Sequence, residues 1–267
     1  MLIPFKKKLS RWMFLLSKEY RELAANFRKM QHPKDTFARL ERALENFGYA
    51  EQLVLKRRLN EFSWPFVLTE HGFNRSMASF ESRVVWNQVT EVTRMFTNAG
   101  YQVFVTNGTL LGLVREGGFL KFDDDLDMAV YFPGADDHEM AKRVSDLASE
   151  FSKLNWSRHH FHKTFHQAVR LESGVTLDVF PIWQLDERTL VPYPTGPLSV
   201  SDLFPTNLRL VDGVEIPIPA DPEKVLQSLY GSGWKQEDLS FRFDWSKGAP
   251  HYQSYRRFCL DYRAISP

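Results

Sequence analysis

The chain has 267 residues, 43% hydrophobic and 25% charged, so it can bury a substantial core and has the composition of a soluble globular protein. Lys and Arg number 34 against 33 Asp and Glu, and a net charge of +1 gives no field that attracts nucleic acid, so we expect no nucleic-acid partner. The single cysteine, Cys259, excludes an internal disulfide and fits a reducing compartment, and we therefore expect a cytoplasmic protein.

Residues 1–30 predict an amphipathic helix, because apolar side chains recur every three or four positions from Phe5 to Met30. This segment holds eight Lys or Arg and two Glu, a local charge of +6. Three interpretations stay open: the helix packs on its own domain, contacts a second copy in an oligomer, or lies on an anionic membrane. The third would make the protein peripheral at the inner face of the membrane. The longest apolar run, residues 12–16, is too short to span a bilayer.

Helical patterns fill most of the chain before residues 64–76, where Pro, Gly and Asn indicate a connector. We therefore expect a helical N-terminal region over residues 1–75 and a second domain over residues 76–267. This domain opens with a helix over about 77–99, which Ser76 is expected to cap.

After this helix the hydrophobic period changes to that of strands. We expect a strand at 101–106, a short helix from Thr109, a glycine loop at Gly117–Gly118 and a second strand at 126–132. The pattern then predicts a helix over 136–151, a hairpin of 166–172 with 175–182, and a helix at about 221–230. Together these elements predict an α+β fold, a small mixed sheet flanked by helices.

Four aspartates stand within five positions where the second strand begins, at Asp123, Asp124, Asp125 and Asp127. Neighbouring carboxylates repel by about 4 kcal/mol per pair at 4 Å and an effective dielectric near 20. Open water or a bound cation must offset this repulsion. Side chains two apart on a strand share a face, so Asp123, Asp125 and Asp127 are expected to point one way and Asp124 toward the core.

A solvated acidic turn would explain the aspartates but leaves the glycine-rich run before them unexplained. A calcium loop of the EF-hand type is excluded, because Met128 and Gly134 stand where that loop needs Gly and Glu. Carboxylate oxygens on a rigid strand suit Mg²⁺ or Mn²⁺, which usually share their ligand shell with substrate phosphates.

Phosphate-binding features surround this strand. Gly108 and Thr109 open a short helix directly after a strand, which is a weak signal for an anion site, and Arg115 at its far end is suited to bidentate phosphate contact. A third carboxylate, Asp178, stands between apolar residues on a later strand, an awkward place for a charge without a partner. A phosphate pocket beside a metal strand indicates phosphoryl or nucleotidyl transfer.

The stretch GTLLGLVREGGFLKFDDDLD (108–127) resembles the signature of the LicD/fukutin family of nucleotidyltransferase-fold phosphotransferases. The segment VDGVEIPIPADPEKVLQSLYGSGWKQ (211–236) is similar to the closing segment of that family, and the resemblance covers roughly residues 80–236. The chain departs from the family pattern at Leu113, where Ala is usual, and at Lys121 and Phe122, which replace Pro and Trp. We place these changes around the donor pocket.

The resemblance implies a nucleotidyltransferase fold with a polymerase β-like palm, as a catalytic domain over residues 76–267. It implies metal-dependent transfer of a phospho-alcohol, of the phosphocholine, ribitol phosphate or glycerol phosphate type, from a CDP-activated donor to a hydroxyl of a glycan acceptor. Such a reaction modifies surface polysaccharide, for example capsule or lipopolysaccharide.

The resemblance also implies roles for single residues, with two Mg²⁺ or Mn²⁺ ions. Asp125 and Asp127 would hold the ions that bridge the donor pyrophosphate. Asp178 would complete the second metal site and take the proton of the acceptor hydroxyl, and Asp123 would bind a metal directly or through water. The phosphates would contact Gly108, Thr109, Arg115 and Lys121.

Other interpretations remain. A metal-dependent sugar-nucleotide glycosyltransferase also uses an Asp-x-Asp motif, but that class places a nucleotide-binding α/β half before the motif, where this chain has helices and a connector. A relative that only binds glycan would be expected to lack one of the three acids. Four histidines lie close together in the sequence: His159, His160, His162 and His166. Two interpretations stay open for them, a zinc site or a polar strand edge or turn that lines the acceptor cleft.

Overall fold

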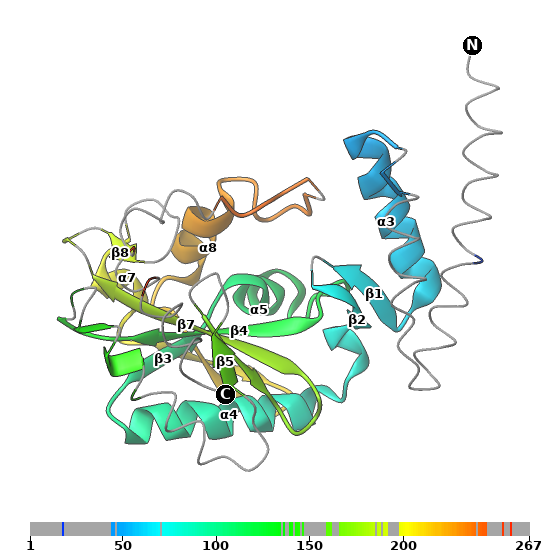
Figure 1. Cartoon of the computed structure of the whole chain (residues 1–267). Coiled ribbons are helices and arrows are strands. Elements are labelled where there is room, and N and C mark those ends of the chain that lie inside the picture. Colours follow the sequence, from blue (N-terminus) through cyan, green and yellow to red (C-terminus); the bar gives the residue numbers. More distant parts are fainter. Residues whose placement is uncertain are drawn as a thin grey trace. The chain divides into compact units, whose positions relative to one another are not determined.

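The computed structural model of the chain is shown in Figure 1. It describes residues 18, 44–45, 47–69, 71–134, 136, 139–140, 142–144, 146, 159–161, 166–184, 186–187, 189–191, 198–238, 240–244, 253 and 257. The expected helix of residues 1–30, and its membrane contact, therefore lie outside the described residues apart from Lys18. None of the helices described is both long and apolar enough to cross a bilayer.

The chain divides into two compact units, and the boundary is not a single point in the sequence. The first unit contains Met1–Ser79 together with the short segment Lys121–Asp124. The second unit contains Phe80–Leu120 and Asp125–Pro267. The aspartate run is thus shared, since its first two members belong to one unit and the others to the next.

In the first unit, helix α3 (Tyr49–Ser63) packs on a hairpin of β1 (Phe66–Thr69) and β2 (Gly72–Arg75). The prediction of a connector at 64–76 was therefore wrong. Pro65 stands just before β1 and Gly72 begins β2, so these residues border strands rather than fill a loop. Asn60 fixes the hairpin on the helix, because its side chain accepts from Leu68 N (2.7 Å) and donates to Leu68 O (3.3 Å).

The second unit is built on a mixed sheet with the strand order β3-β4-β7-β6-β5, with β8 paired to β7. Its strands β4 and β7 are parallel, and all other neighbours are antiparallel. The strands are β3 (Gln102–Val105), β4 (Asp125–Tyr131), β5 (His159–Phe161), β6 (Gln167–Arg170), β7 (Thr176–Gln184) and β8 (Leu190–Val191).

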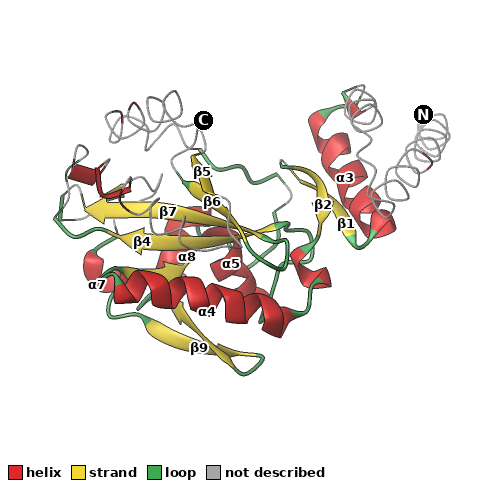
Figure 2. Cartoon of the chain, turned by 60° about the horizontal axis from the view of Figure 1, so that its bottom comes forward, coloured by secondary structure: helices red, strands yellow, loops and turns green. Residues whose placement is uncertain are grey.

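Helices and a second hairpin surround this sheet. The bounds are η1 (Met77–Ser79), α4 (Ser82–Asn98), α5 (Asn107–Leu111), η2 (Gly112–Glu116), α7 (Val200–Leu203), β9 (Asn207–Val211), β10 (Val214–Ile218) and α8 (Pro222–Tyr230). Helix α4 packs on β3 and β10. Helix α5 packs on β4 and α8 (Figure 2). Trp86 and Phe96 of α4 and Phe104 of β3 are fully buried in the core between these elements.

The predicted α+β fold with a small mixed sheet is confirmed, as are the strands at 101–106 and 126–132 and the hairpin around residue 173. The predicted helix at 221–230 is α8. Two helix starts were wrong. Helix α4 begins at Ser82 with Glu81 as its N-cap, since a 3-10 turn occupies 77–79, and α5 begins at Asn107 rather than Thr109. Most of the expected helix over 136–151 lies outside the described residues.

A close approach explains the second glycine of the GTLLGLVREGGF stretch. A Cβ on Gly112 would lie 2.5 Å from the carbonyl oxygen of Gly118, which is closer than real atoms approach. Gly118 N–H donates to Gly112 O at 3.2 Å, so the glycine loop folds back on the end of α5. Phe119 then stacks on the buried Trp86, with ring centroids 4.5 Å apart. The loop that leads toward the aspartates is therefore anchored where it begins, at Gly118 and Phe119.

Candidate active site

Asp127 and Asp178 are direct neighbours on the two parallel strands at the centre of the sheet. The register pairs Asp127 of β4 with Asp178 of β7, and only 8% and 6% of these residues, respectively, is exposed. Residues opposite each other on adjacent strands place their side chains on the same face, about 5 Å apart. Asp125 lies two positions earlier on β4, on that same face, and is half-buried. The structure therefore gathers three of the predicted carboxylates.

Thr109 joins the predicted phosphate turn to this strand. The backbone N–H of Asp127 donates to the Thr109 hydroxyl at 2.7 Å, and Thr109 N–H donates to Asp127 Oδ2 at 3.4 Å. Thr106 N–H donates to the carbonyl of Asp127 at 3.1 Å, which continues the β3–β4 ladder up to the start of α5. Gly108 lies between these threonines in the first turn of α5. The turn and the carboxylate are thus one hydrogen-bonded structure.

Asp178 has one engaged oxygen and one unpartnered oxygen. His166 Nε2 lies 3.0 Å from Asp178 Oδ2, and both side chains are more than nine-tenths buried. Asp178 Oδ1 is buried and has no hydrogen-bond partner among the described residues. A buried carboxylate oxygen without a donor or a cation is costly.

These residues fit a divalent cation. Carboxylates on β4 and β7 supply only oxygen ligands, which Mg²⁺ and Mn²⁺ prefer. The unpartnered Oδ1 of Asp178 is the kind of atom that a cation would satisfy. The repulsion among three neighbouring carboxylates is also reduced by a bound positive charge.

Asp123, Asp124 and Lys121 belong to the first unit, where the β1–β2 hairpin and its flank hold them. Met77 N–H donates to the carbonyl of Asp123 at 2.8 Å, and the Ser76 hydroxyl donates to the carbonyl of Lys121 at 2.7 Å. The prediction that Ser76 caps α4 was therefore wrong. Lys121 is exposed, with its ammonium 5.2 Å from the centre of the Phe122 ring.

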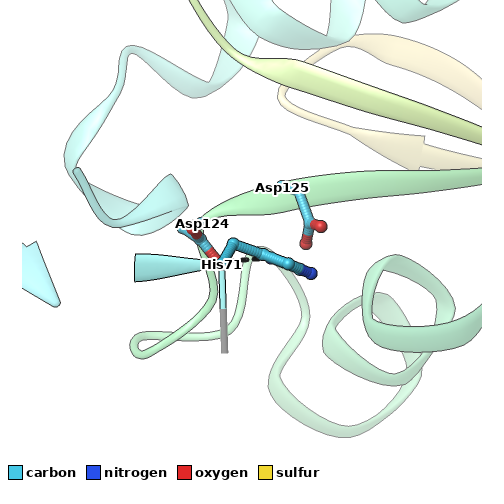
Figure 3. Close-up of side chains that lie close together, drawn as sticks. All are labelled: His71, Asp124 and Asp125. Carbon is cyan, nitrogen blue, oxygen red and sulfur yellow. Dashed lines mark hydrogen bonds and ion pairs between the residues drawn. The ribbon is translucent and has the colours of Figure 1, made fainter. Parts of the chain in front are cut away.

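Asp124 points into the hairpin rather than into the core of the sheet, which corrects the expected alternation of the aspartates. The strand begins only at Asp125, so the residues before it do not follow a two-residue period. The Asp124 side chain is 3% exposed, Asn74 Nδ2 donates to its Oδ2, and His71 Nδ1 lies 3.3 Å from its Oδ1 (Figure 3). Figure 3 also shows Asp125, the next residue of the chain. Histidine and aspartate, the residue types labelled there, both serve as metal ligands in proteins.

Arg115 lies in the last turn of η2, just before Gly117. Its Nε donates to Glu116 at 3.0 Å and its Nη1 to the carbonyl of Trp234 at 3.4 Å, and its side chain is 16% exposed. Arg115 therefore ties the GTLLGLVR stretch to the YGSGW stretch, the two segments that carried the family resemblance.

A cavity of about 670 Å³ lies elsewhere in the second unit, between α4 and the β9–β10 hairpin. It is lined by α4 threonines and by Leu208 and Leu210 of β9, while none of the three gathered carboxylates lines it. Because it borders Gln102, which pairs with Tyr131 at the far end of β4, it is at the opposite end of the sheet from Asp125.

A glycine-bearing turn after a strand, two acids on the next strand and a third acid on its parallel neighbour define a nucleotidyltransferase domain. Residues 100–221 match the family model described as LicD/FKTN/FKRP, nucleotidyltransferase domain. The match confirms the resemblance to the LicD/fukutin family over these residues.

Two curated relatives share part of this chain. The uncharacterized protein RP689 of Rickettsia prowazekii (strain Madrid E) is 22% identical over 179 residues, which cover 64% of this chain and 63% of that protein. The uncharacterized protein RT0683 of Rickettsia typhi (strain ATCC VR-144 / Wilmington) is 24% identical over 178 residues, covering 64% of this chain and 53% of that protein. The chain thus spans less than two thirds of the length of these relatives.

Two solved structures are similar at low identity. The antibiotic-resistance factor ANT(2'')-Ia aligns with a TM-score of 0.39 and 15% identity, covering 69% of this chain and 88% of the other. An antigenic nucleotidyltransferase-like protein from Paracoccidioides brasiliensis aligns with a TM-score of 0.37 and 12% identity, covering 66% and 77%.

The sequence did not single out His166 as a partner of Asp178, nor His71 and Asn74 as partners of Asp124. His166 was one of four histidines in a polar stretch, and His71 and Asn74 stood in a segment interpreted as a connector. A signal for His166 existed, because a hairpin centred on residues 173–174 places it two residues beyond the position opposite Asp178.

Proposed function

We propose that this protein transfers a phospho-alcohol, of the phosphocholine, ribitol phosphate or glycerol phosphate type, from a CDP-activated donor to a glycan hydroxyl. In this reaction the glycan oxygen forms a bond to the phosphorus of the phospho-alcohol, the bond to the bridging oxygen breaks, and CMP leaves. The observation that carries the proposal is the pairing of Asp127 with Asp178 on parallel strands, with Asp178 Oδ1 buried and unpartnered. The match of residues 100–221 to the LicD/FKTN/FKRP family model also supports this proposal.

We assign the metal ligands to Asp125, Asp127 and Asp178, with Asp123 as a further ligand. Two Mg²⁺ or Mn²⁺ ions, when bound, would stabilise the charge that develops on the attacking and leaving oxygens. Asp178 is also the residue that we assign to accept the proton of the glycan hydroxyl. The two hydrogen bonds between Asp127 and Thr109 fix the position of Asp127 as a metal ligand in this proposal.

In this proposal the donor phosphates are bound by Gly108, Thr109, Arg115 and Lys121. The first turn of α5 presents backbone N–H groups next to the carboxylates. A guanidinium has five N–H donors, and the hydrogen bonds of Arg115 to Glu116 and Trp234 use only Nε and Nη1. Lys121 is exposed, and its ammonium lies 5.2 Å from the centre of the Phe122 ring.

Release of CMP tests this proposal. CDP-choline, CDP-ribitol, CDP-glycerol and CDP-ethanolamine would each be incubated with the full chain and Mg²⁺ or Mn²⁺, with Asp127→Asn as the control. We expect one donor to be turned over, by slow hydrolysis when no acceptor is present, and only with a divalent ion. No CMP from any donor, combined with release of UDP or GDP from a sugar nucleotide, would favour the glycosyltransferase instead.

We infer that the acceptor is a surface polysaccharide such as capsule or lipopolysaccharide, modified on the cytoplasmic side. The eight basic residues of segment 1–30 support a contact with the inner face of the membrane. Anionic liposomes should bind the full chain and not a variant that lacks residues 1–30. Equal binding of both forms would contradict the membrane contact and leave the transfer reaction unaffected.

A further inference from the structure

We propose that His166 is a positioning residue for Asp178, which it holds so that one carboxylate oxygen is left for a divalent ion. This inference deepens the proposed function and rests on it, since it presumes that Asp178 binds metal. It concerns a residue outside the carboxylates, the glycine turn and the basic side chains assigned above.

The contact between the two side chains is direct and shielded from water. His166 Nε2 lies 3.0 Å from Asp178 Oδ2, with exposed side-chain fractions of 9% and 8%. A carboxylate oxygen only accepts, so the nitrogen that faces it carries the hydrogen. A hydrogen bond to a charged group in a buried setting is among the stronger ones.

The contact divides the carboxylate into two different oxygens. His166 engages Oδ2, while Oδ1 is buried and without a hydrogen-bond partner among the residues that the structure describes. Rotation of the Asp178 carboxylate about its χ2 bond would break this hydrogen bond. His166 therefore fixes the orientation of the carboxylate, so that one oxygen stays available on the face shared with Asp127.

The imidazole ring is itself fixed by packing. Its centroid lies 4.8 Å from that of Phe180, at an interplanar angle of 41°. Phe180 stands two positions after Asp178 on β7, on the same face, and residue 166 precedes β6, which pairs antiparallel with β7. The sheet register thus places Phe180 and Asp178 on one face of the sheet. There the Phe180 ring packs against His166, and the Asp178 carboxylate accepts its hydrogen bond.

Residues that orient a metal ligand in this way typically change metal affinity or activity by about 10–100-fold when they are replaced. Two substitutions separate the hydrogen bond from the packing. His166→Phe keeps an aromatic ring against Phe180 and removes the donor. His166→Gln removes the ring but keeps an amide N–H at a position close to that of Nε2.

The experiment is a titration of the full-length protein with Mn²⁺, in which free Mn²⁺ is followed by electron paramagnetic resonance. Wild type, His166→Phe, His166→Gln and Asp178→Asn are compared, and thermal unfolding verifies that each is folded. We expect His166→Phe to weaken Mn²⁺ binding about 10–100-fold and His166→Gln to recover most of the affinity. Weaker binding by His166→Gln than by His166→Phe would show that the ring serves packing alone and would overturn the inference.

Two further results separate this inference from the function beneath it. Loss of affinity in Asp178→Asn, with wild-type affinity in both His166 variants, would overturn the positioning role and leave the metal site intact. Wild-type protein that binds no Mn²⁺ would overturn the proposed function itself.

Discussion

Thr109 and Asp127 exchange two hydrogen bonds, one from the Asp127 backbone N–H to the Thr109 hydroxyl (2.7 Å) and one from the Thr109 backbone N–H to Asp127 Oδ2 (3.4 Å). Both residues are buried. This pair ties the turn that we assign to phosphate binding to the strand that we assign to metal binding. Displacement of one element would therefore displace the other.

Replacement of Thr109 by Val should destabilise the protein by about 1–3 kcal/mol, because it leaves the buried N–H of Asp127 without an acceptor at nearly unchanged volume. Thr109→Ser keeps the hydroxyl and is the matched control. Urea unfolding of the three proteins measures the effect. Equal free energies of unfolding for Thr109→Val and Thr109→Ser would contradict the assigned hydrogen bond.

Gly112→Ala should destabilise the protein by about 1–3 kcal/mol, because the added Cβ would collide with the carbonyl of Gly118 at 2.5 Å. Gly118→Ala is the control, since nothing lies within 4 Å of a Cβ at that position. The two midpoints of thermal unfolding should differ clearly. If both variants unfold at the same temperature, the loop does not fold back on Gly112 in solution.

Asn74→Asp should weaken the first unit, because it places a second carboxylate beside the buried carboxylate of Asp124. The double variant Asn74→Asp with Asp124→Asn restores an amide–carboxylate hydrogen bond in the reverse direction. Free energies of unfolding for the wild type, both single variants and the double variant form a cycle whose coupling measures the contact. We expect the double variant to be more stable than Asn74→Asp alone. Additive effects of the two substitutions would contradict the contact.

Asp202 should make stability depend on acid pH. Burial raises the pKa of Asp202, whereas hydrogen bonds from Lys224 (2.7 Å) and Ser199 (2.8 Å) lower it. The hydrogen bonds together outweigh the burial, so the pKa of Asp202 lies below its ordinary value. A carboxyl whose pKa is lower in the folded state stabilises the fold above about pH 4, and that contribution is lost as the pH falls through the folded pKa.

The free energy of unfolding of Asp202→Asn should therefore fall less steeply below about pH 4 than that of the wild type. Glu223→Gln serves as the comparison, because Glu223 pairs with Lys235 at an exposed position, where a salt bridge contributes little to stability. Denaturant unfolding at several pH values between 7 and 3 provides the measurement. The same slope in Asp202→Asn as in the wild type would contradict the shift.

Local pattern predicted the central strands of the second unit, β3, β4, β6 and β7. The grouping of Asp178 with Asp125 and Asp127 came from the family resemblance, and in the structure the parallel register of β4 and β7 pairs Asp127 with Asp178. The fold of the first unit could not be predicted in the same way. Its strands β1 and β2 are four residues long and bordered by Pro65 and Gly72, so the period-2 signal was too short to outweigh the turn signals.

The partners of the aspartates were also beyond local pattern. His166 meets Asp178 through the hairpin register, and Asn74 meets Asp124 across fifty residues of sequence. Both contacts depend on tertiary placement, which one sequence does not encode in any short motif. The family match begins at residue 100, so Asn74 stands outside the segment that it covers.

The central claim is that the carboxylates of β4 and β7 act together with divalent ions in transfer from a CDP-activated donor. The most direct test is the initial rate of CMP formation from the preferred CDP-alcohol at saturating Mn²⁺. Wild type, Asp127→Asn and Asp178→Asn would be compared, with EDTA as the metal-free reference. The account predicts that each substitution lowers the rate by at least about 100-fold and that EDTA abolishes it. Wild-type rates in either variant, or turnover that persists in EDTA, would contradict it.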